Sequence, residues 1–162
     1  MDMEERSPSP GQKMNFEEYL NAYGSLTYKN VGSSMMPLLK QGRDTFTLVS
    51  KNRPLKKWDA VLFRRNGKYV LHRIIRLHPE WGTYTMLGDN CVTMERDIPE
   101  EDVLGIMTEF THKGKRVTEG TFWYRLYLFF WIRPYPIRIF IKKCLLAGKR
   151  LGKKAVPKNN SN

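Results

Sequence analysis

Between residues 31 and 110 the chain carries a series of short apolar runs, each about the length of one β-strand, separated by turn-forming residues. The runs are rich in β-branched and aromatic residues, and they are too short for ordinary helices. Asn66-Gly67 separates two of them, and this dipeptide is the strongest short-range signal for a β-hairpin. We therefore predict a mainly β fold of antiparallel strands, with strands at residues 45–49, 60–64, 69–77, 83–87 and 103–110.

The start of the chain divides into two segments. Residues 1–13 contain acidic side chains and the string SPSPG, without an apolar run after a basic start, so we expect a disordered lead and no N-terminal signal peptide. Asn15 precedes an amphipathic segment, with Glu18 three residues later as in a capping box and Gly24 as a suitable stop. A short N-terminal helix is predicted there.

The positive charge is concentrated at the C-terminal end. Residues 1–110 contain 15 Lys/Arg and 15 Asp/Glu, whereas residues 111–162 contain 13 and one, and the whole chain carries a net charge of +12. A length of 162 residues fits one domain. The two cysteines, Cys91 and Cys144, are far apart, which excludes a disulfide scaffold and a zinc finger. We expect a neutral folded body followed by a basic segment.

Three motifs carry the chemistry: GSSMMP at residues 32–37, YVLHRII at 69–75 and LGDN at 87–90. Together and in this order they resemble the type I signal peptidase superfamily, over residues 31–110. The resemblance implies a signal peptidase-like β-sheet catalytic domain at residues 14–120, related to that of self-cleaving repressors. It also implies a serine endopeptidase that cleaves a leader or signal-like segment from a precursor protein.

The resemblance assigns roles to residues of the first two motifs. It makes Ser34 the nucleophile, and it gives Met35 and Pro37 the task of holding the turn on which the nucleophile lies. His72 stands where typical bacterial signal peptidases have lysine, so the match is to the archaeal and endoplasmic reticulum branch. Catalysis in that branch resembles the action of a Ser-His pair assisted by an acid.

The physical chemistry of such a site agrees with these roles. A serine hydroxyl needs an imidazole to take its proton, and a carboxylate must fix the imidazole tautomer. Asp97 is the favoured acid, Glu95 is an alternative, and Asp89 is either a further alternative or an orienting carboxylate. The Ser34 N–H is one candidate donor to the oxyanion, and a second donor is unassigned. The resemblance implies no metal or organic cofactor.

Each motif also has an ordinary structural interpretation. Ser33-Ser34 could be a simple turn, His72 a hydrogen-bonded core histidine, and Gly88-Asp89-Asn90 a turn between strands. Their joint occurrence favours the peptidase. Two other interpretations stay open, namely a catalytically inactive peptide-binding module of the same fold and a self-cleaving regulator. The expected partner is a precursor peptide or protein, and the sequence does not indicate an oligomeric state.

Residues 121–147 form an aromatic and basic segment, in which seven of the eleven residues at 122–132 are aromatic. Arg125, Arg133 and Arg138, together with two prolines, argue against a simple transmembrane span. Aromatic rings and arginines favour the membrane interface. We therefore predict a hydrophobic helical tail that binds a membrane surface, at its cytoplasmic face, followed by a basic flexible tail at 148–162. The alternative is packing of the aromatic residues on the β domain or a partner subunit, and nucleic acid binding ranks lower.

Overall fold

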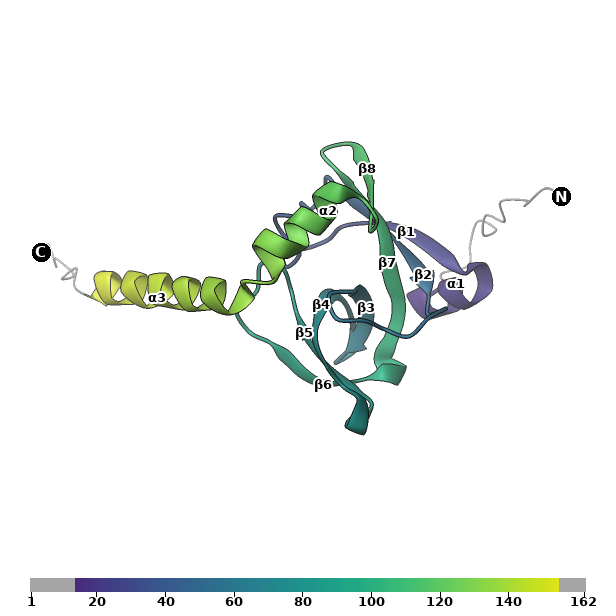
Figure 1. Ribbon diagram of the computed structural model, residues 1–162, viewed down its shortest axis with the longest axis horizontal. Coiled ribbons are helices and arrows are strands. Elements are labelled where there is room, and N and C mark those ends of the chain that lie inside the picture. Colours follow the sequence, from purple (N-terminus) through teal and green to yellow (C-terminus); the bar gives the residue numbers. More distant parts are fainter. Residues whose placement is uncertain (1–13, 155–162) are drawn as a thin grey trace, which may run out of the picture.

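The computed structural model describes residues 14–154, with side chains as far as residue 147 (Figure 1). The lead predicted at 1–13 and residues 155–162 of the predicted tail lie outside the described residues. The elements in chain order are α1 (Phe16–Tyr23), β1 (Ser25–Lys29), β2 (Thr45–Ser50), β3 (Ala60–Arg65), β4 (Lys68–His78), η1 (Pro79–Trp81), β5 (Thr83–Leu87), β6 (Glu95–Pro99), η2 (Glu100–Asp102), β7 (Val103–His112), β8 (Lys115–Thr118), α2 (Phe122–Tyr127), η3 (Leu128–Ile132) and α3 (Tyr135–Lys154).

The described strands form one antiparallel sheet in the order β1-β2-β7-β3-β4-β5-β6, with β8 paired to β7. β7 is long enough to pair along one edge with β2 and along the other with β3 and then β8. Figure 1 shows that the sheet curls into a half-barrel. The prediction of a mainly β fold is confirmed, and all five predicted strands are present as β2, β3, β4, β5 and β7.

The local signals at two chain reversals act as the sequence predicts. Asn66 and Gly67 both have positive φ angles, 49° and 70°, and join β3 to β4 in register. Such angles at both central residues match the right-handed twist of the flanking strands. Asn15 and Glu18 form the predicted capping box of α1, and Gly24 ends the helix in the left-handed conformation. The predicted N-terminal helix is confirmed.

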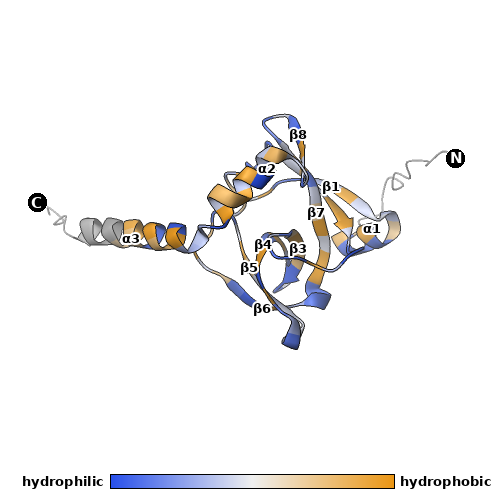
Figure 2. Ribbon diagram, viewed as in Figure 1, coloured by the Kyte–Doolittle hydropathy of each residue, from blue (hydrophilic) through white to orange (hydrophobic). Residues whose placement is uncertain are grey.

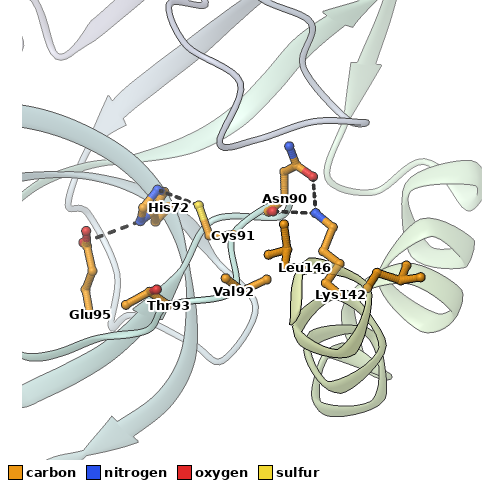
Figure 3. Close-up of a pocket in the computed structure, with 9 residues that line it drawn as sticks. His72, Asn90, Cys91, Val92, Thr93, Glu95, Lys142 and Leu146 are labelled. Atoms are coloured by element: carbon orange, nitrogen blue, oxygen red, sulfur yellow. Dashed lines mark hydrogen bonds and ion pairs between the residues drawn. The ribbon is translucent and has the colours of Figure 1, made fainter. Parts of the chain in front are cut away.

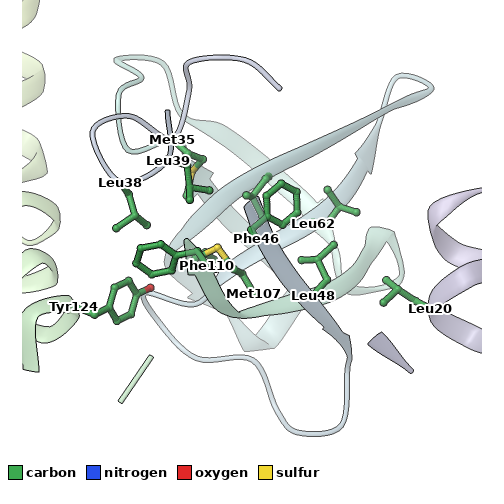
Figure 4. Packing of buried hydrophobic residues seen from close by; sticks show 12 residues of the cluster. Leu20, Met35, Leu38, Leu39, Phe46, Leu48, Leu62, Met107, Phe110 and Tyr124 are labelled. Carbon is green, nitrogen blue, oxygen red and sulfur yellow. The ribbon is translucent and has the colours of Figure 1, made fainter. Parts of the chain in front are cut away.

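Two apolar clusters hold the sheet together. The larger one lies between α1, the turn after Ser34 and the strands β2, β3 and β7, and it includes Met35 and Tyr124 (Figure 4). The second surrounds Phe63 and Ile74 on the neighbouring strands. Tyr124 belongs to α2, so the aromatic segment contributes to the core of the β domain. The boundary predicted at residue 120 therefore divides segments that pack together.

The C-terminal segment has one face on the sheet and one face exposed. Tyr124, Ile132 and Ile139 are buried, the last of them near the start of α3. The rest of α3 extends away from the body (Figures 1 and 2). α3 continues to Lys154, across the boundary predicted at residue 147. Within residues 14–154, no helix combines the length and the apolar character that crossing a bilayer requires.

Candidate active site

Ser34 lies in the turn between β1 and β2, and the side chain that follows it anchors this turn in the core. Met35 is 1% exposed, and its carbonyl accepts from the Leu39 N–H at 3.0 Å. The Met36 N–H donates to the Ser33 carbonyl at 3.2 Å, which closes the turn around Ser34. Pro37 is exposed, and Ser34 is half-buried beside the sheet. The fixed backbone and the accessible hydroxyl suit a nucleophile.

His72 lies in the middle of β4, and its imidazole is buried among strands. The residue is 5% exposed, and burial lowers the pKa of the imidazole below its usual value. The negative charge of Glu95 opposes this shift without reversing it. The ring is therefore neutral at neutral pH, which is the state that a general base requires.

Gly88 brings the serine turn and His72 together. A Cβ added at Gly88 would lie 2.8 Å from His72 Nε2, 2.9 Å from the Ser34 carbonyl oxygen and 2.6 Å from Cys91 Sγ. The His72 side chain and the Ser34 backbone carbonyl therefore border the same small space, which only glycine leaves open. Among the described residues, no hydrogen bond joins the Ser34 hydroxyl to His72 Nε2. Catalytic hydrogen bonds often tighten only when substrate is bound.

Glu95 is the acid beside His72. Its Oε2 lies 3.5 Å from His72 Nδ1 (Figure 3), which is a contact and not a hydrogen bond, and neither buried atom has a hydrogen-bond partner in the described structure. Arg65 lies 3.3 Å from the same carboxylate oxygen and holds it from the other side. Glu95 thus contacts one ring nitrogen of His72, while the other nitrogen faces Gly88 and the serine turn. This is the order of groups that acid-assisted Ser-His catalysis requires.

Asp97, the acid favoured from the sequence, lies elsewhere. It is exposed, has a positive φ of 56°, and lines a hollow with His78 and Trp81, away from His72. The pairing of β5 with β6 shifts register beside it, so Glu95 and Asp97 do not share a face as they would on a regular strand. Of the predicted acids, Glu95, which was the alternative, lies beside His72, and Asp97 does not.

Asp89 lies in a buried cluster, which fits the orienting carboxylate considered for it from the sequence. The carboxylate is 1% exposed and accepts from Arg73 Nε at 2.9 Å and from Nη2 at 2.8 Å. Tyr127 donates to the same carboxylate at 2.8 Å, and Arg73 donates to the Tyr124 hydroxyl at 2.8 Å. This buried cluster joins β4, the Gly88-Asp89-Asn90 loop and α2. It fixes the loop without facing the serine hydroxyl.

Cys91 is the residue at this site that the sequence interpretation did not use. Its Sγ lies 4.0 Å from His72 Nε2, and burial raises the pKa of the thiol. A thiol with a raised pKa is mostly protonated at neutral pH, which does not favour it as a nucleophile. Its position directly after Gly88-Asp89-Asn90 was the available signal.

A hollow of about 590 Å³ opens beside His72. It is lined by His72, Glu95 and the residues that follow Gly88-Asp89-Asn90, and α3 supplies its far wall through Lys142, Leu145 and Leu146 (Figure 3). The lining is largely apolar, with His72 and Glu95 at one end and Asn90 and Lys142 at the other. Its size suits the side chains of a bound peptide.

No protein-family model matches the chain, and no curated protein matches its sequence significantly.

Proposed function

We propose that this protein is a serine endopeptidase of the signal peptidase type, which cleaves a leader or signal-like segment from a precursor protein. The observation that carries the proposal is the meeting of the Ser34 turn and His72 over Gly88, with Glu95 behind His72. The motifs that resemble signal peptidases are the segments that meet there. The curled antiparallel sheet is compatible with the catalytic domain that the resemblance implies.

In the proposed reaction Ser34 Oγ attacks the peptide carbonyl, and its proton passes to His72 Nε2. Glu95 then stabilises the imidazolium through Nδ1, which lies 3.5 Å from the carboxylate. His72 returns the proton to the leaving amine as the carbon–nitrogen bond breaks. Water, deprotonated by the same imidazole, hydrolyses the acyl ester on Ser34 and restores the enzyme.

The test of this proposal is covalent labelling with a fluorophosphonate probe, because the probe reacts with an activated serine and needs no knowledge of the substrate. We expect labelling of the full chain at Ser34, identified by peptide mass mapping. Ser34→Ala and His72→Ala are expected to abolish labelling and to retain a cooperative thermal transition. Labelling that persists in either folded variant would contradict the proposal. Labelling that is lost in Cys91→Ala but kept in Ser34→Ala would point to the thiol.

A second candidate is a peptide-binding module without turnover. It is favoured by one observation, namely that the Ser34 backbone and His72 meet at Gly88 while no hydrogen bond joins the Ser34 hydroxyl to His72 in the described structure. The two candidates differ in outcome. The inactive module predicts no labelling of Ser34 in the wild-type protein, whereas the peptidase predicts labelling that depends on His72.

We also propose that the C-terminal segment binds the surface of an anionic membrane. Its exposed face carries large apolar side chains, including Trp123 and Phe140, which are 73% and 69% exposed. Arg125 and Arg133 lie among them, and each cation near an anionic leaflet contributes about 1 kcal/mol of attraction. Aromatic rings that lie beside cations are typical of interfacial helices.

A further inference from the structure

α3 is joined to the Gly88-Asp89-Asn90 loop by a lysine whose charge is held against two oxygen atoms. Lys142 Nζ lies 2.7 Å from the Asn90 carbonyl oxygen and 2.5 Å from Asn90 Oδ1 (Figure 3). Lys142 is half-buried, whereas its neighbour Lys143 is exposed. Hydrogen bonds from a charged donor are roughly twice as strong as neutral ones. Lys142 therefore holds Asn90 from the side of α3.

Asn90 is bound on its other side to the serine turn. Its backbone N–H donates to the Ser34 carbonyl at 2.7 Å, and its side-chain Nδ2 donates to the Ser33 carbonyl at 3.2 Å. The amide group of Asn90 thus accepts from Lys142 at Oδ1 while it donates to Ser33 at Nδ2. A continuous chain of hydrogen bonds leads from α3 through Asn90 to the backbone that carries the Ser34 hydroxyl.

We infer that Lys142 is a positioning residue for Ser34, which it holds in place beside His72 by fixing Asn90. The inference rests on the proposed peptidase function and adds α3 to the machinery of the site. A charged donor on Oδ1 polarises the amide and strengthens the bond that Nδ2 makes to Ser33. α3 also carries the exposed apolar face, so the position of α3 on the body and the alignment of Ser34 are linked.

The experiment compares three variants of the full chain in fluorophosphonate labelling. Lys142→Met is expected to lower the second-order rate constant for labelling of Ser34 by about tenfold, since small displacements of a reacting group cost rate steeply. Lys142→Arg keeps a charged donor and restores most of the rate. Lys143→Met removes the same charge from an exposed position and leaves the rate unchanged. Equal rates for Lys142→Met and wild type would overturn the inference.

A double variant tests whether Lys142 acts through Asn90. If it does, Asn90→Ala combined with Lys142→Met labels no more slowly than Asn90→Ala alone, because the two changes break the same link. Additive losses would show that Lys142 acts by another route and would overturn the inference.

Hydrogen exchange separates failure of this inference from failure of the peptidase proposal. The Asn90 N–H is bound to the Ser34 carbonyl, so its exchange rate reports the link whether or not Ser34 reacts. We expect exchange at Asn90 to accelerate about tenfold in Lys142→Met, and not in Lys143→Met. If wild type is not labelled but Asn90 exchange accelerates in Lys142→Met, the peptidase proposal is contradicted and the link is supported. If wild type is labelled but exchange does not accelerate in Lys142→Met, only the link is contradicted.

Discussion

At the scale of single residues, Gly88 decides whether the site can form. Its φ is not positive, so the requirement for glycine comes from space and not from backbone conformation. His72 Nε2 and the Ser34 carbonyl oxygen both lie within 3.0 Å of the position that a Cβ would take. The glycine of the Gly-Asp-Asn motif therefore has a physical reason, because it lets two other motifs approach each other.

Gly88→Ala is accordingly expected to abolish labelling of Ser34. The added methyl group would displace the imidazole and the serine turn by several tenths of an ångström, and such a displacement is costly for catalysis. The measurement is the rate of fluorophosphonate labelling together with the melting temperature. Gly120→Ala is the matched control, since its Cβ would meet no atom within 4 Å and its φ is not positive. A labelling rate for Gly88→Ala equal to that of the control would argue against this account of Gly88.

The pH dependence of labelling follows from the burial of His72. Burial lowers the pKa of the imidazole below 6.5, and the neutral ring is the active form. Labelling is therefore retained at neutral pH and is lost only as the pH falls through this lowered pKa. Because Glu95 raises the pKa of His72, Glu95→Gln shifts the loss to still lower pH. The plateau rate falls at least about tenfold, since the imidazolium loses its partner.

The control for that profile is Asp97→Asn, which removes an exposed carboxylate away from His72. It is expected to leave both the plateau and the acidic limb in place. A shift of the limb in Asp97→Asn, with none in Glu95→Gln, would restore the acid role to Asp97.

Sequence reasoning predicted Ser34 and His72 as a pair but favoured Asp97 as the acid, whereas Glu95 lies beside His72. Motif order alone does not say which carboxylate a strand turns toward the imidazole. The choice depends on the register shift between β5 and β6 and on the positive φ of Asp97, neither of which leaves a sequence signal. Lys142 was missed for a related reason, because its contact with Asn90 joins segments that are distant in the sequence.

At the scale of elements, the Arg73–Asp89 pair joins β4 and the Gly88-Asp89-Asn90 loop to α2. Arg73 is fully buried, and both of its donor branches are used, by Asp89 and by the Trp58 carbonyl with the Tyr124 hydroxyl. Burial also raises the pKa of Tyr127, so its hydroxyl remains a donor to Asp89 across the accessible pH range. Tyr124 and Tyr127 of α2 thus stabilise the fold, whereas Trp123 and Phe129, which the packing alternative concerned, are exposed.

Breaking this pair is expected to destabilise the fold strongly. Asp89→Asn leaves the buried charge of Arg73 without its partner, a change that costs about 3–5 kcal/mol in free energy of unfolding. Tyr127→Phe removes one hydrogen bond to a charged group and costs about 1.5–3 kcal/mol. Urea denaturation measures both values. Equal stability of Asp89→Asn and the surface variant Asp97→Asn would contradict this role of the pair.

Strand prediction succeeded where a buried face left an apolar pattern and failed at exposed edges. β2 to β5 and β7 carry buried residues that the sequence displays as apolar runs. β1, β6 and β8 are short and largely exposed, and β6 has the sequence ERDIP, so no alternation marks them. Such strands form because they pair with a neighbouring strand, and their own sequences show no strand pattern.

At the scale of the whole molecule, the C-terminal segment has two faces with different tasks. One face buries Tyr124, Ile132 and Ile139 and brings Lys142 to Asn90 at the candidate site. The other exposes aromatic and aliphatic side chains along α2, η3 and α3. Residues 1–110 carry no net charge, so the positive charge of the molecule lies in its C-terminal part. This part gives the molecule one basic, apolar surface beside the candidate site. A bilayer bound there would lie next to the hollow that α3 helps to line.

The membrane proposal predicts flotation of the full chain with vesicles that contain phosphatidylserine. Flotation is expected to weaken with neutral phosphatidylcholine vesicles and with added salt, because the cations contribute through screened attraction. Replacing two exposed rings, in Trp123→Ser with Phe140→Ser, removes apolar contact without touching the buried face, so binding weakens while Ser34 labelling in solution persists. Trp81→Ser is the matched control, since Trp81 is 70% exposed but lies on η1. If the double variant floats as wild type does, these rings do not bind the membrane and the proposal is contradicted. If wild type forms a dimer and never floats, the exposed face serves another copy of the chain.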